Sequence, residues 1–506
     1  MKLIRIYFPV LLAALMLSVS RIPLHLGFLA FFAFVPLLWF FERRIYSARE
    51  LLLAASVFTA VFILIVLSWI SEVTPGGLFG IFIIYSLVYW LVFYAMQRIS
   101  RVFPAWRYVA FASLLITFEY LQNFGETRFP WWNISYSLAD YNLLLQALDL
   151  LGLAGLSLLV LISNILIFKL VTASGQLKQK KRIGLALLVL FGLWFGYGLY
   201  TLRTLPLQKH DARVFVMQPS IRQEIKWDEK AYAGILATYQ KLSSKAAADG
   251  AKLLIYPEAA MPVYLLREPG EIGPLRKMMT ENDLEIFTGF PDYRQAPETY
   301  HYPYYYYNAA ALFKPEMQPV EPYYKNILVP VGERMLWLKT FPILWKLEFG
   351  QANWEFGTDL KWYRSGSFEF SPNICYEIAF PELFHRMAIP RKEAEFHKTD
   401  YLVNITNDAW FGTSYGPWLH GVMTRFRAIE NRVQIYRSAQ TGLSMIVDPL
   451  GRTLASTKLF EQTNITAPLF TTKRIPLLRH IYKYPLVICL TALLLFVAAV
   501  ITKREK

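Results

Sequence analysis

The chain has 506 residues, of which 55% are hydrophobic and only 18% are charged. This length leaves room for more than one domain, and the apolar composition excludes an ordinary soluble protein in favour of one with membrane spans. The formal net charge of +15 would also suit a protein that binds nucleic acid. Because much of that charge falls in short loops between apolar runs, we expect no nucleic-acid partner.

Eight apolar runs predict membrane-spanning helices. They lie near residues 6–20, 24–41, 51–70, 77–97, 105–124, 150–171, 183–200 and 484–501. Most approach the roughly 20 residues that cross about 30 Å of hydrocarbon. Lys2 and Arg5 ahead of the first run also resemble the start of a signal peptide, but we expect this run to be retained.

Basic residues mark alternate loops between these runs, and this bias predicts the orientation of the chain. Three loops carry basic clusters within 43–49, 98–107 and 178–182, whereas the alternate short loops carry only Arg21 and Arg128. Both termini are therefore expected in the cytoplasm, and the long block between the last two runs is expected outside it.

That block differs in character from the rest, since strand-like runs such as RVFVMQ, KLLIYPE and YLVNITND alternate with turns and polar helical stretches. The alternation is typical of a layered α/β domain. We therefore predict a seven-helix membrane domain at 1–204, an extracytoplasmic α/β domain at 205–480, and a final transmembrane helix with a cytoplasmic tail at 481–506. No P-loop or GxGxxG motif occurs, and the seven histidines form no HExxH or Cys/His cluster. We expect neither a cofactor nor a metal site.

Cys375 is the first candidate for chemistry. The segment SFEFSPNICYEIAFPE places it at the end of an extended run and just before a predicted helix. A thiol at such a turn is accessible, and nearby N–H groups can favour its thiolate. A lone cysteine can equally be a buried structural residue, and both interpretations stay open at this point. The other cysteine, Cys489, lies in the last apolar run, where a thiol acts as a small hydrophobe.

Charged candidates follow two other strand-like runs. Glu258 follows the strand in KLLIYPEAAMP, where partial burial would raise its pKa toward that of a general base. It could instead cap a helix. The segment YYKNILVPVGE offers Lys325, which could stabilise an anion or lie on the surface, and Glu333.

Three further segments admit two interpretations each. NITNDAWFG, with Asn407, Asp408 and Trp410, is either a substrate-binding loop or a turn with an aromatic plug. The GTSYG segment at 412–416 fits the GxSxG nucleophile pattern, but it follows a turn-rich loop, so we do not expect a serine hydrolase. Residues 334–347 mix apolar and basic side chains and could be an arm that enters the membrane interface or an amphipathic core helix.

Taken together, and in this order, PEAAMP, the lysine of YYKNILVPVGE and the cysteine of NICYE resemble the Glu–Lys–Cys triad of the nitrilase superfamily. A domain of that kind between seven spans and one resembles the apolipoprotein N-acyltransferase family. The resemblance extends to FPWWNISYS at 129–137, to NDAWFG and to GPWLH. It implies an α/β/β/α sandwich in the extracytoplasmic domain and a multi-pass protein of the bacterial inner membrane with a periplasmic catalytic domain.

The resemblance also implies roles for individual residues. Glu258 would be the general base, Lys325 the oxyanion stabiliser and Cys375 the nucleophile. Supporting and substrate-binding roles would fall to Glu333, Tyr376, Glu377, Asn308 and Trp410. The implied reaction moves an acyl chain from a phospholipid, through a cysteine thioester, to the N-terminal amine of a diacylated apolipoprotein.

Two other functions remain possible on the sequence alone. One is a membrane-tethered nitrilase or amidase that hydrolyses a small soluble amide. The other is a transporter whose outer domain only binds ligand, although ionisable residues such as Glu119 and Asp149 fall near the ends of the predicted spans rather than at mid-membrane.

Overall fold

The computed structural model describes residues 2–173, 175, 177–226, 229–268, 270–298, 300–316, 320–346, 352–392 and 395–502. The chain folds into two compact units. One comprises Met1–Thr204 with His480–Lys506, and the other comprises Leu205–Arg479. The predicted cytoplasmic tail beyond Thr502 lies outside the described residues.

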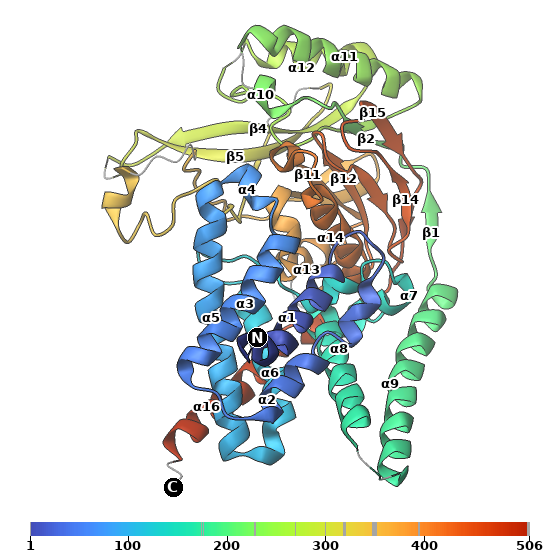
Figure 1. The fold of residues 1–506 in the computed structure, drawn as a ribbon. Helices are drawn as coiled ribbons and strands as arrows, with labels where there is room; N and C mark the ends of the chain where they lie inside the picture. Colours follow the sequence, from blue (N-terminus) through green and yellow to red (C-terminus); the bar gives the residue numbers. More distant parts are fainter. Residues whose placement is uncertain are drawn as a thin grey trace. The chain divides into compact units, whose positions relative to one another are not determined.

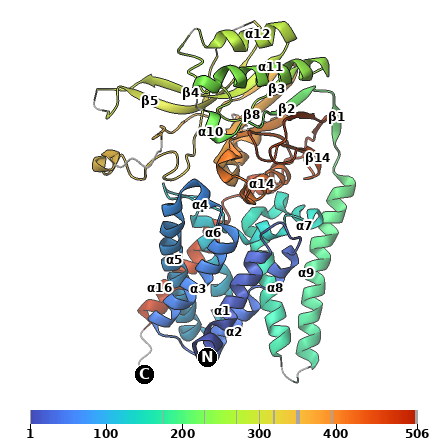
Figure 2. The ribbon, with the colours of Figure 1, turned by 45° about the horizontal axis from the view of Figure 1, so that its top comes forward.

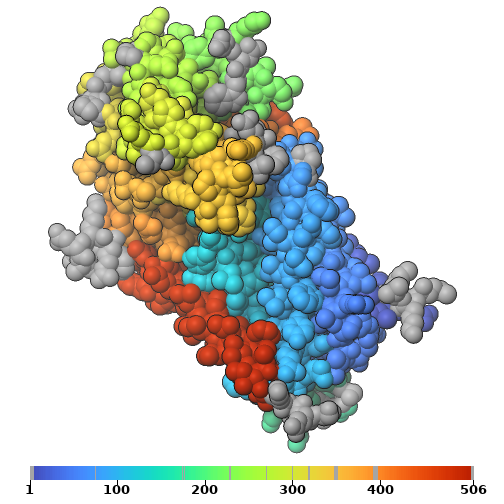
Figure 3. Space-filling view, turned by 90° about the vertical axis from the view of Figure 1, so that its left-hand side faces the viewer, coloured from blue at the N-terminus to red at the C-terminus, as the bar shows by residue number. Residues whose placement is uncertain are grey.

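The first unit is helical (Figure 1). Its main helices are α1 (Lys2–Val19), α2 (Val35–Arg43), α3 (Ala48–Val66), α4 (Ile70–Val73), α5 (Pro75–Val102), α6 (Arg107–Leu121), α7 (Asn142–Leu145), α8 (Leu148–Thr172), α9 (Leu177–Thr204) and α16 (Pro485–Ile501). The C-terminal α16 packs against α5 and α6, far from it in sequence, as Figure 3 shows in red and blue. Arg98 Nε donates to the Ala499 carbonyl at 3.0 Å across this packing.

Five of the described helices are long and apolar enough to cross a membrane: α3, α5, α8, α9 and the segment Leu478–Ile501 that contains α16. Local signals fix some of their ends. The N-terminus of α3, for example, is closed by a capping box in which Ser47 and Glu50 each accept the other's backbone N–H. The predicted spans at 6–20 and 105–124 correspond to the shorter helices α1 and α6. The count of about eight spans therefore stays a prediction.

The apolar run at 24–41, predicted as a span, is not one continuous helix. The structure has a 3₁₀ turn at Gly27–Phe31 followed by the short helix α2. Pro36 lacks an N–H and sits in the first turn of α2, where that lack is tolerated. Asn164 of α8 satisfies the backbone at the break: its Oδ1 accepts from Phe34 N–H at 2.9 Å, and its Nδ2 donates to the Ala30 carbonyl at 2.8 Å.

The predicted loop at 129–137 is folded into this unit. Arg21 is buried and donates from its two terminal nitrogens to the carbonyls of Asn133, at 2.8 Å, and Trp131, at 2.9 Å. Trp132 stacks on Phe62 with ring centroids 3.9 Å apart. Arg21 is thus part of the packing of this unit. This explains why a basic residue occurs in a loop of the set that otherwise carries almost none.

The second unit contains two six-stranded sheets. The first sheet has the order β15-β2-β3-β4-β5-β6, with strands at Thr463–Thr466, Val214–Gln218, Leu253–Ile255, Glu285–Gln295, Tyr304–Phe313 and Tyr323–Tyr324. The second has the order β14-β13-β12-β11-β8-β7, with strands at Thr453–Ser456, Met445–Val447, Gln434–Ala439, Tyr401–Thr406, Phe368–Ile374 and Tyr363–Ser365. A short ribbon pairs β1 (Gln208–His210) with β16 (Leu469–Thr471), and another pairs β9 (Arg391–Lys392) with β10 (Glu395–Phe396).

The two sheets pack face to face and are covered by helices on their outer faces. Ser438 Oγ of β12 donates to the Met217 carbonyl of β2 at 2.7 Å, and the rings of Phe287 and Phe370 meet edge to face at 5.4 Å. Helices α11 (Tyr232–Ala248) and α12 (Ile272–Asn282) cover the first sheet, as Figure 2 shows. Helices α13 (Pro381–Ala388) and α14 (Gly416–Asn431) pack on the second. The predicted α/β/β/α sandwich is confirmed.

The segment at 334–346 is no amphipathic helix. It consists of turns and a 3₁₀ helix at Pro342–Lys346, and residue 347 lies outside the described part of the chain. Trp345 packs under Tyr300 and Tyr302, whereas Trp337, Phe341 and Ile343 expose 47%, 53% and 66% of their surface.

Candidate active site

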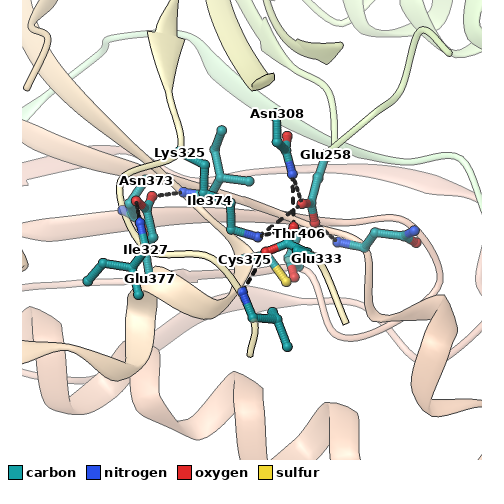
Figure 4. A network of polar contacts seen from close by, with 12 residues as sticks. Glu258, Asn308, Lys325, Ile327, Glu333, Asn373, Ile374, Cys375, Glu377 and Thr406 are labelled. Carbon is teal, nitrogen blue, oxygen red and sulfur yellow. Dashed lines mark hydrogen bonds and ion pairs between the residues drawn. The ribbon is translucent and has the colours of Figure 1, made fainter. Parts of the chain in front are cut away.

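Three predicted site residues follow the ends of three strands, on two different sheets. Glu258 follows β3 and Lys325 follows β6 in the first sheet, while Cys375 directly follows β8 in the second. Figure 4 shows the Cys375 sulfur beside the side chains of Glu258 and Lys325. The site is therefore assembled only when the two sheets pack together.

A hydrogen-bonded cluster of buried charges forms the centre of the site. Lys325 is 1% exposed, and its Nζ lies 2.8 Å from Glu333 Oε1 and 3.4 Å from Glu258 Oε1. Asn308 Nδ2 donates to the same two carboxylates, at 2.7 Å to Glu258 and 3.2 Å to Glu333. The surface-lysine interpretation of Lys325 is thus wrong, because its ammonium bridges two acids.

The second sheet completes the cradle around Glu258. Glu258 Oε2 accepts from the backbone N–H of Asn407, which directly follows β11, at 2.8 Å. On the other side β4 approaches closely: a Cβ added at Gly289 would lie 2.7 Å from Ala259 N and 2.9 Å from the Glu258 Cα. With an acceptor role toward three donors, Glu258 does not serve as a helix cap.

Electrostatics set the resting protonation of these groups. Burial would raise the pKa of Glu258, but Lys325 and the Asn308 amide outweigh it and hold that pKa below its usual value. Burial, reinforced by Glu258, raises the pKa of the Cys375 thiol well above its usual value, against the opposing effect of Lys325. Burial alone would lower the pKa of Lys325, but the two carboxylates raise it. The resting site therefore holds a neutral thiol beside an ionised carboxylate and an ammonium.

The backbone at Cys375 is unusual. Its φ of +52° lies in the left-handed region, between β8 and a 3₁₀ helix at Cys375–Ala379. A non-glycine residue is held there only by its surroundings, and such strain is frequent at active sites. The residue is half-buried. The strand-to-helix turn predicted from the sequence is confirmed.

Glu377 and Tyr376 lie behind the nucleophile. Glu377 accepts from the backbone N–H groups of Ile374 at 2.7 Å, Asn326 at 2.6 Å and Ile327 at 3.1 Å, and from the Tyr323 hydroxyl at 2.8 Å. Burial raises its pKa to about 7. It thereby ties the turn that carries Cys375 to the loop that carries Lys325. Tyr376 is buried and its ring meets Phe380 edge to face at 5.2 Å.

The remaining candidates divide between the site and the surface. Trp410, in the 3₁₀ helix Asp408–Phe411, is 49% exposed, whereas the neighbouring Asp408 is 1% exposed. Ser414 of the GxSxG-like segment donates to the Phe411 carbonyl at 2.7 Å within a turn before α14, which is not a strand-to-helix elbow. In the described part of the chain, no group of three or more His, Cys, Asp and Glu side chains could hold a metal ion.

Lys226 is a buried residue of the site that was not predicted from the sequence. It ends the short helix α10 (Gln223–Lys226), is 2% exposed, and its Nζ donates to the Glu258 carbonyl at 3.0 Å. Burial lowers its pKa to about 8, with Glu258 and Cys375 opposing the shift. It supplies a second positive charge beside Glu258. The chain has 52 Lys and Arg residues, and no local motif distinguishes Lys226 from the others.

Two family models match the chain. Carbon-nitrogen hydrolase matches residues 214–470, and the N-terminal domain of apolipoprotein N-acyltransferase matches residues 13–166. The first therefore covers more than half of the 506 residues and corresponds to the two-sheet unit.

Curated relatives agree with both models. An apolipoprotein N-acyltransferase of Geobacter metallireducens is 33% identical over 358 residues, which cover 70% of this chain and 66% of that protein. One from Chlorobaculum tepidum is 29% identical over 497 residues, covering 93% of this chain and 91% of that protein. One from Rickettsia typhi is 29% identical over 392 residues, 76% of this chain and 74% of that protein. The chain belongs to the carbon-nitrogen hydrolase family and, within it, to the apolipoprotein N-acyltransferases.

Proposed function

We propose that this protein transfers an acyl chain from a phospholipid to the N-terminal α-amine of a diacylglyceryl-cysteine apolipoprotein, through a thioester on Cys375. The observation that carries the proposal is the half-buried thiol beside the buried Glu258–Lys325–Glu333 cluster. It occurs in a chain that also has five apolar helices long enough to span a membrane. We place the protein in the bacterial inner membrane with its two-sheet unit in the periplasm, as the distribution of basic residues predicts.

In the first half-reaction, Glu258 takes the thiol proton as Cys375 Sγ attacks the ester carbonyl of the phospholipid. The Lys325 ammonium, held charged by its two carboxylates, stabilises the oxyanion that forms. The carbon–oxygen bond then breaks, and the departing lysophospholipid alkoxide takes the proton back from Glu258. The products are a lysophospholipid and an acyl thioester on Cys375.

In the second half-reaction, the acceptor's α-amine attacks the thioester carbonyl. Its pKa of about 8 leaves a usable fraction unprotonated near neutral pH, and Glu258 removes the proton it loses on bond formation. The carbon–sulfur bond breaks, an amide forms, and the thiolate recovers its proton from Glu258. Glu333 and Asn308 hold Lys325 and Glu258 in place throughout.

Both substrates carry acyl chains, so neither needs to leave the bilayer. The exposed apolar side chains of Trp337, Phe341 and Ile343, with Lys339 between them, would suit a segment that enters the membrane interface. Such an arm would bring lipid toward the site and keep water from a thioester that hydrolysis would waste.

The proposal is tested by intact-mass analysis of the purified full chain after incubation with phosphatidylethanolamine in detergent micelles. We expect one acyl adduct that neutral hydroxylamine removes and that a diacylglyceryl-cysteine peptide discharges as an amide. Cys489→Ala should form the same adduct, because Cys489 lies in α16. A chain that forms no adduct but hydrolyses a small soluble amide would replace the proposal with the amidase alternative.

Glu258→Gln separates the two ways in which Glu258 acts on the thiol. Removing the negative charge lowers the pKa of Cys375, so the pH midpoint for its alkylation by iodoacetamide should fall. Acylation by phospholipid should nevertheless slow by about 10² to 10⁴-fold, because the base is gone. Both are measured by mass spectrometry in a Cys489→Ala background. Glu321→Gln, at an exposed carboxylate, is the matched control and should change neither. Acylation at the unaltered rate in Glu258→Gln would remove Glu258 from the mechanism.

A further inference from the structure

A buried polar ladder crosses three neighbouring strands beneath the nucleophile. Asn373 of β8, Asn404 of β11 and Arg437 of β12 are register partners, and all three are fully buried. Arg437 Nη1 donates to Asn404 Oδ1, Asn404 Nδ2 donates to Asn373 Oδ1 at 2.6 Å, and Asn373 Nδ2 donates to the Val403 carbonyl at 3.1 Å. The ladder fixes the guanidinium of Arg437 in the sheet.

Arg437 in turn holds Asp408. Its Nη2 donates to Asp408 Oδ2 at 2.8 Å, while Asp408 Oδ1 accepts from Thr406 Oγ1 at 2.9 Å. Burial would raise the pKa of Asp408, but Arg437 and His420 outweigh it and lower that pKa to about 2. Asp408 is therefore a fixed anion. The backbone of Gly442 is so close that a Cβ there would overlap its carboxylate.

His420 of α14 connects Asp408 to the nucleophile. It is 1% exposed, its Nδ1 lies 2.9 Å from Asp408 Oδ1, and its Nε2 lies 3.2 Å from the backbone carbonyl oxygen of Cys375. A carbonyl oxygen only accepts, so this second contact requires a proton on Nε2. Burial and the charge of Arg437 lower the pKa of His420 and keep the ring neutral, so Nδ1 is an acceptor, to which Arg437 Nη2 donates at 3.0 Å. The network that begins at Arg437 thus ends on the peptide of the nucleophile itself.

That peptide is the one whose orientation matters most. Cys375 has a φ of +52°, so its neighbours must hold it against relaxation. In a planar trans peptide the carbonyl of Cys375 and the N–H of Tyr376 point in opposite directions. Fixing the Cys375 carbonyl therefore also fixes the Tyr376 N–H, together with the Cα of Cys375 from which the thiol side chain extends.

We propose that His420, held by Arg437, which Asp408 anchors, is a positioning residue that sets the Cys375–Tyr376 peptide and with it the direction of the Cys375 thiol. A set of apolar side chains could pack α14 on the sheet without burying charges. Packing alone therefore does not explain why buried charged residues here lead to a hydrogen bond on the carbonyl of the nucleophile. A role in positioning the nucleophile does explain it. The inference relies on the proposed function only in taking Cys375 as the nucleophile.

Two amide substitutions separate positioning from packing. In His420→Gln the side-chain amide can reach as far as Nε2 and can still donate to the Cys375 carbonyl. In His420→Asn it reaches only as far as Nδ1, so its amide oxygen can still accept from Arg437 while the contact with Cys375 is lost. The readouts are the single-turnover rate of acyl-adduct formation from phosphatidylethanolamine micelles, the lipid concentration at half-saturation, and Tm, all in a Cys489→Ala background.

We expect His420→Asn to slow adduct formation by about 10²-fold at unchanged half-saturation, the usual effect of a reacting group displaced by about 1 Å. His420→Gln should restore the rate to within about tenfold of the parent. Equal losses of rate and Tm in both variants, or a parental rate in His420→Asn, would overturn the positioning role.

Alkylation by iodoacetamide keeps this inference separate from the proposed function, because it reports on the thiol without any lipid. His420→Asn should shift the pH midpoint of Cys375 alkylation and His420→Gln should return it toward the parent. If the parent chain forms no acyl adduct, the proposed function fails, while the alkylation pair still decides the role of His420. Identical midpoints in all three chains would again reject it.

Discussion

Replacing Cys375 with alanine is expected to abolish acyl-adduct formation and lysophospholipid release, a loss of at least about 10⁴-fold. The reason is that both half-reactions pass through the sulfur: without it, the amine would have to attack an unactivated ester directly. Adduct formation is followed by intact mass and lysophospholipid by thin-layer chromatography. Cys489→Ala is the control, and it should retain the parental rate.

The same variant decides between the two interpretations of a lone cysteine. Alanine is smaller than cysteine and tolerates the positive φ no worse, so a purely catalytic thiol can be removed with Tm unchanged to within about 2 °C. A structural thiol would behave in the opposite way, with Tm falling and acyl transfer persisting in whatever fraction stays folded. Cys375→Ser should also be inactive, because a hydroxyl proton is much harder to remove than a thiol proton.

Lys325→Met is expected to reduce adduct formation by at least about 10³-fold and to destabilise the two-sheet unit by about 3 kcal/mol. The substitution leaves Glu258 and Glu333 buried together without the cation that separates them. One of them must then take up a proton, which removes the base as well as the oxyanion stabiliser. Adduct formation is measured by intact mass and the stability of the variant by thermal unfolding.

A second substitution resolves these combined effects. Lys325→Met with Glu333→Gln removes the surplus carboxylate and should recover most of the lost stability while adduct formation stays low. Lys252→Met, at a lysine that is 55% exposed and paired with Asp283, is the matched control for loss of a surface cation. A Lys325→Met chain with parental activity would show that another group, such as Lys226, stabilises the oxyanion.

How much of this arrangement could be predicted depended on the range of the interactions. Hydropathy indicated the long apolar helices, and strand ends indicated Glu258 and Cys375, because both signals are local. The break near Ala30 could not be predicted, since the chain is stabilised there by Asn164, more than a hundred residues away. Hydropathy alone measures how apolar a run is and not whether its backbone stays helical.

Within the site, residue type and order indicated the triad, and the family resemblance added supports such as Glu333. Neither assigned a role to Lys226 or His420. Lys226 and His420 act through backbone carbonyls, and such contacts leave no pattern in the residues on either side. Lys325 would have been assigned to the surface on residue type alone, yet it is buried, because Glu333, eight residues later, and Glu258, 67 residues earlier, neutralise it. In residues 334–346 the spacing of apolar residues suits a helix, but the backbone does not follow it, and Trp337 adopts a φ of +54°.

The ladder of Asn373, Asn404 and Arg437 constrains how this sequence can change. Each member satisfies the next, so replacing one by an apolar residue strands a buried polar partner, at a cost of about 1 to 3 kcal/mol. Replacing all three at once would strand none among them, but would release Asp408 from its cation. Because these positions sit opposite one another in register, a one-residue slip of β11 would also turn Asn404 to the other face of the sheet. These three positions can therefore change only together, because a substitution at one of them alone leaves a buried partner without its hydrogen bond.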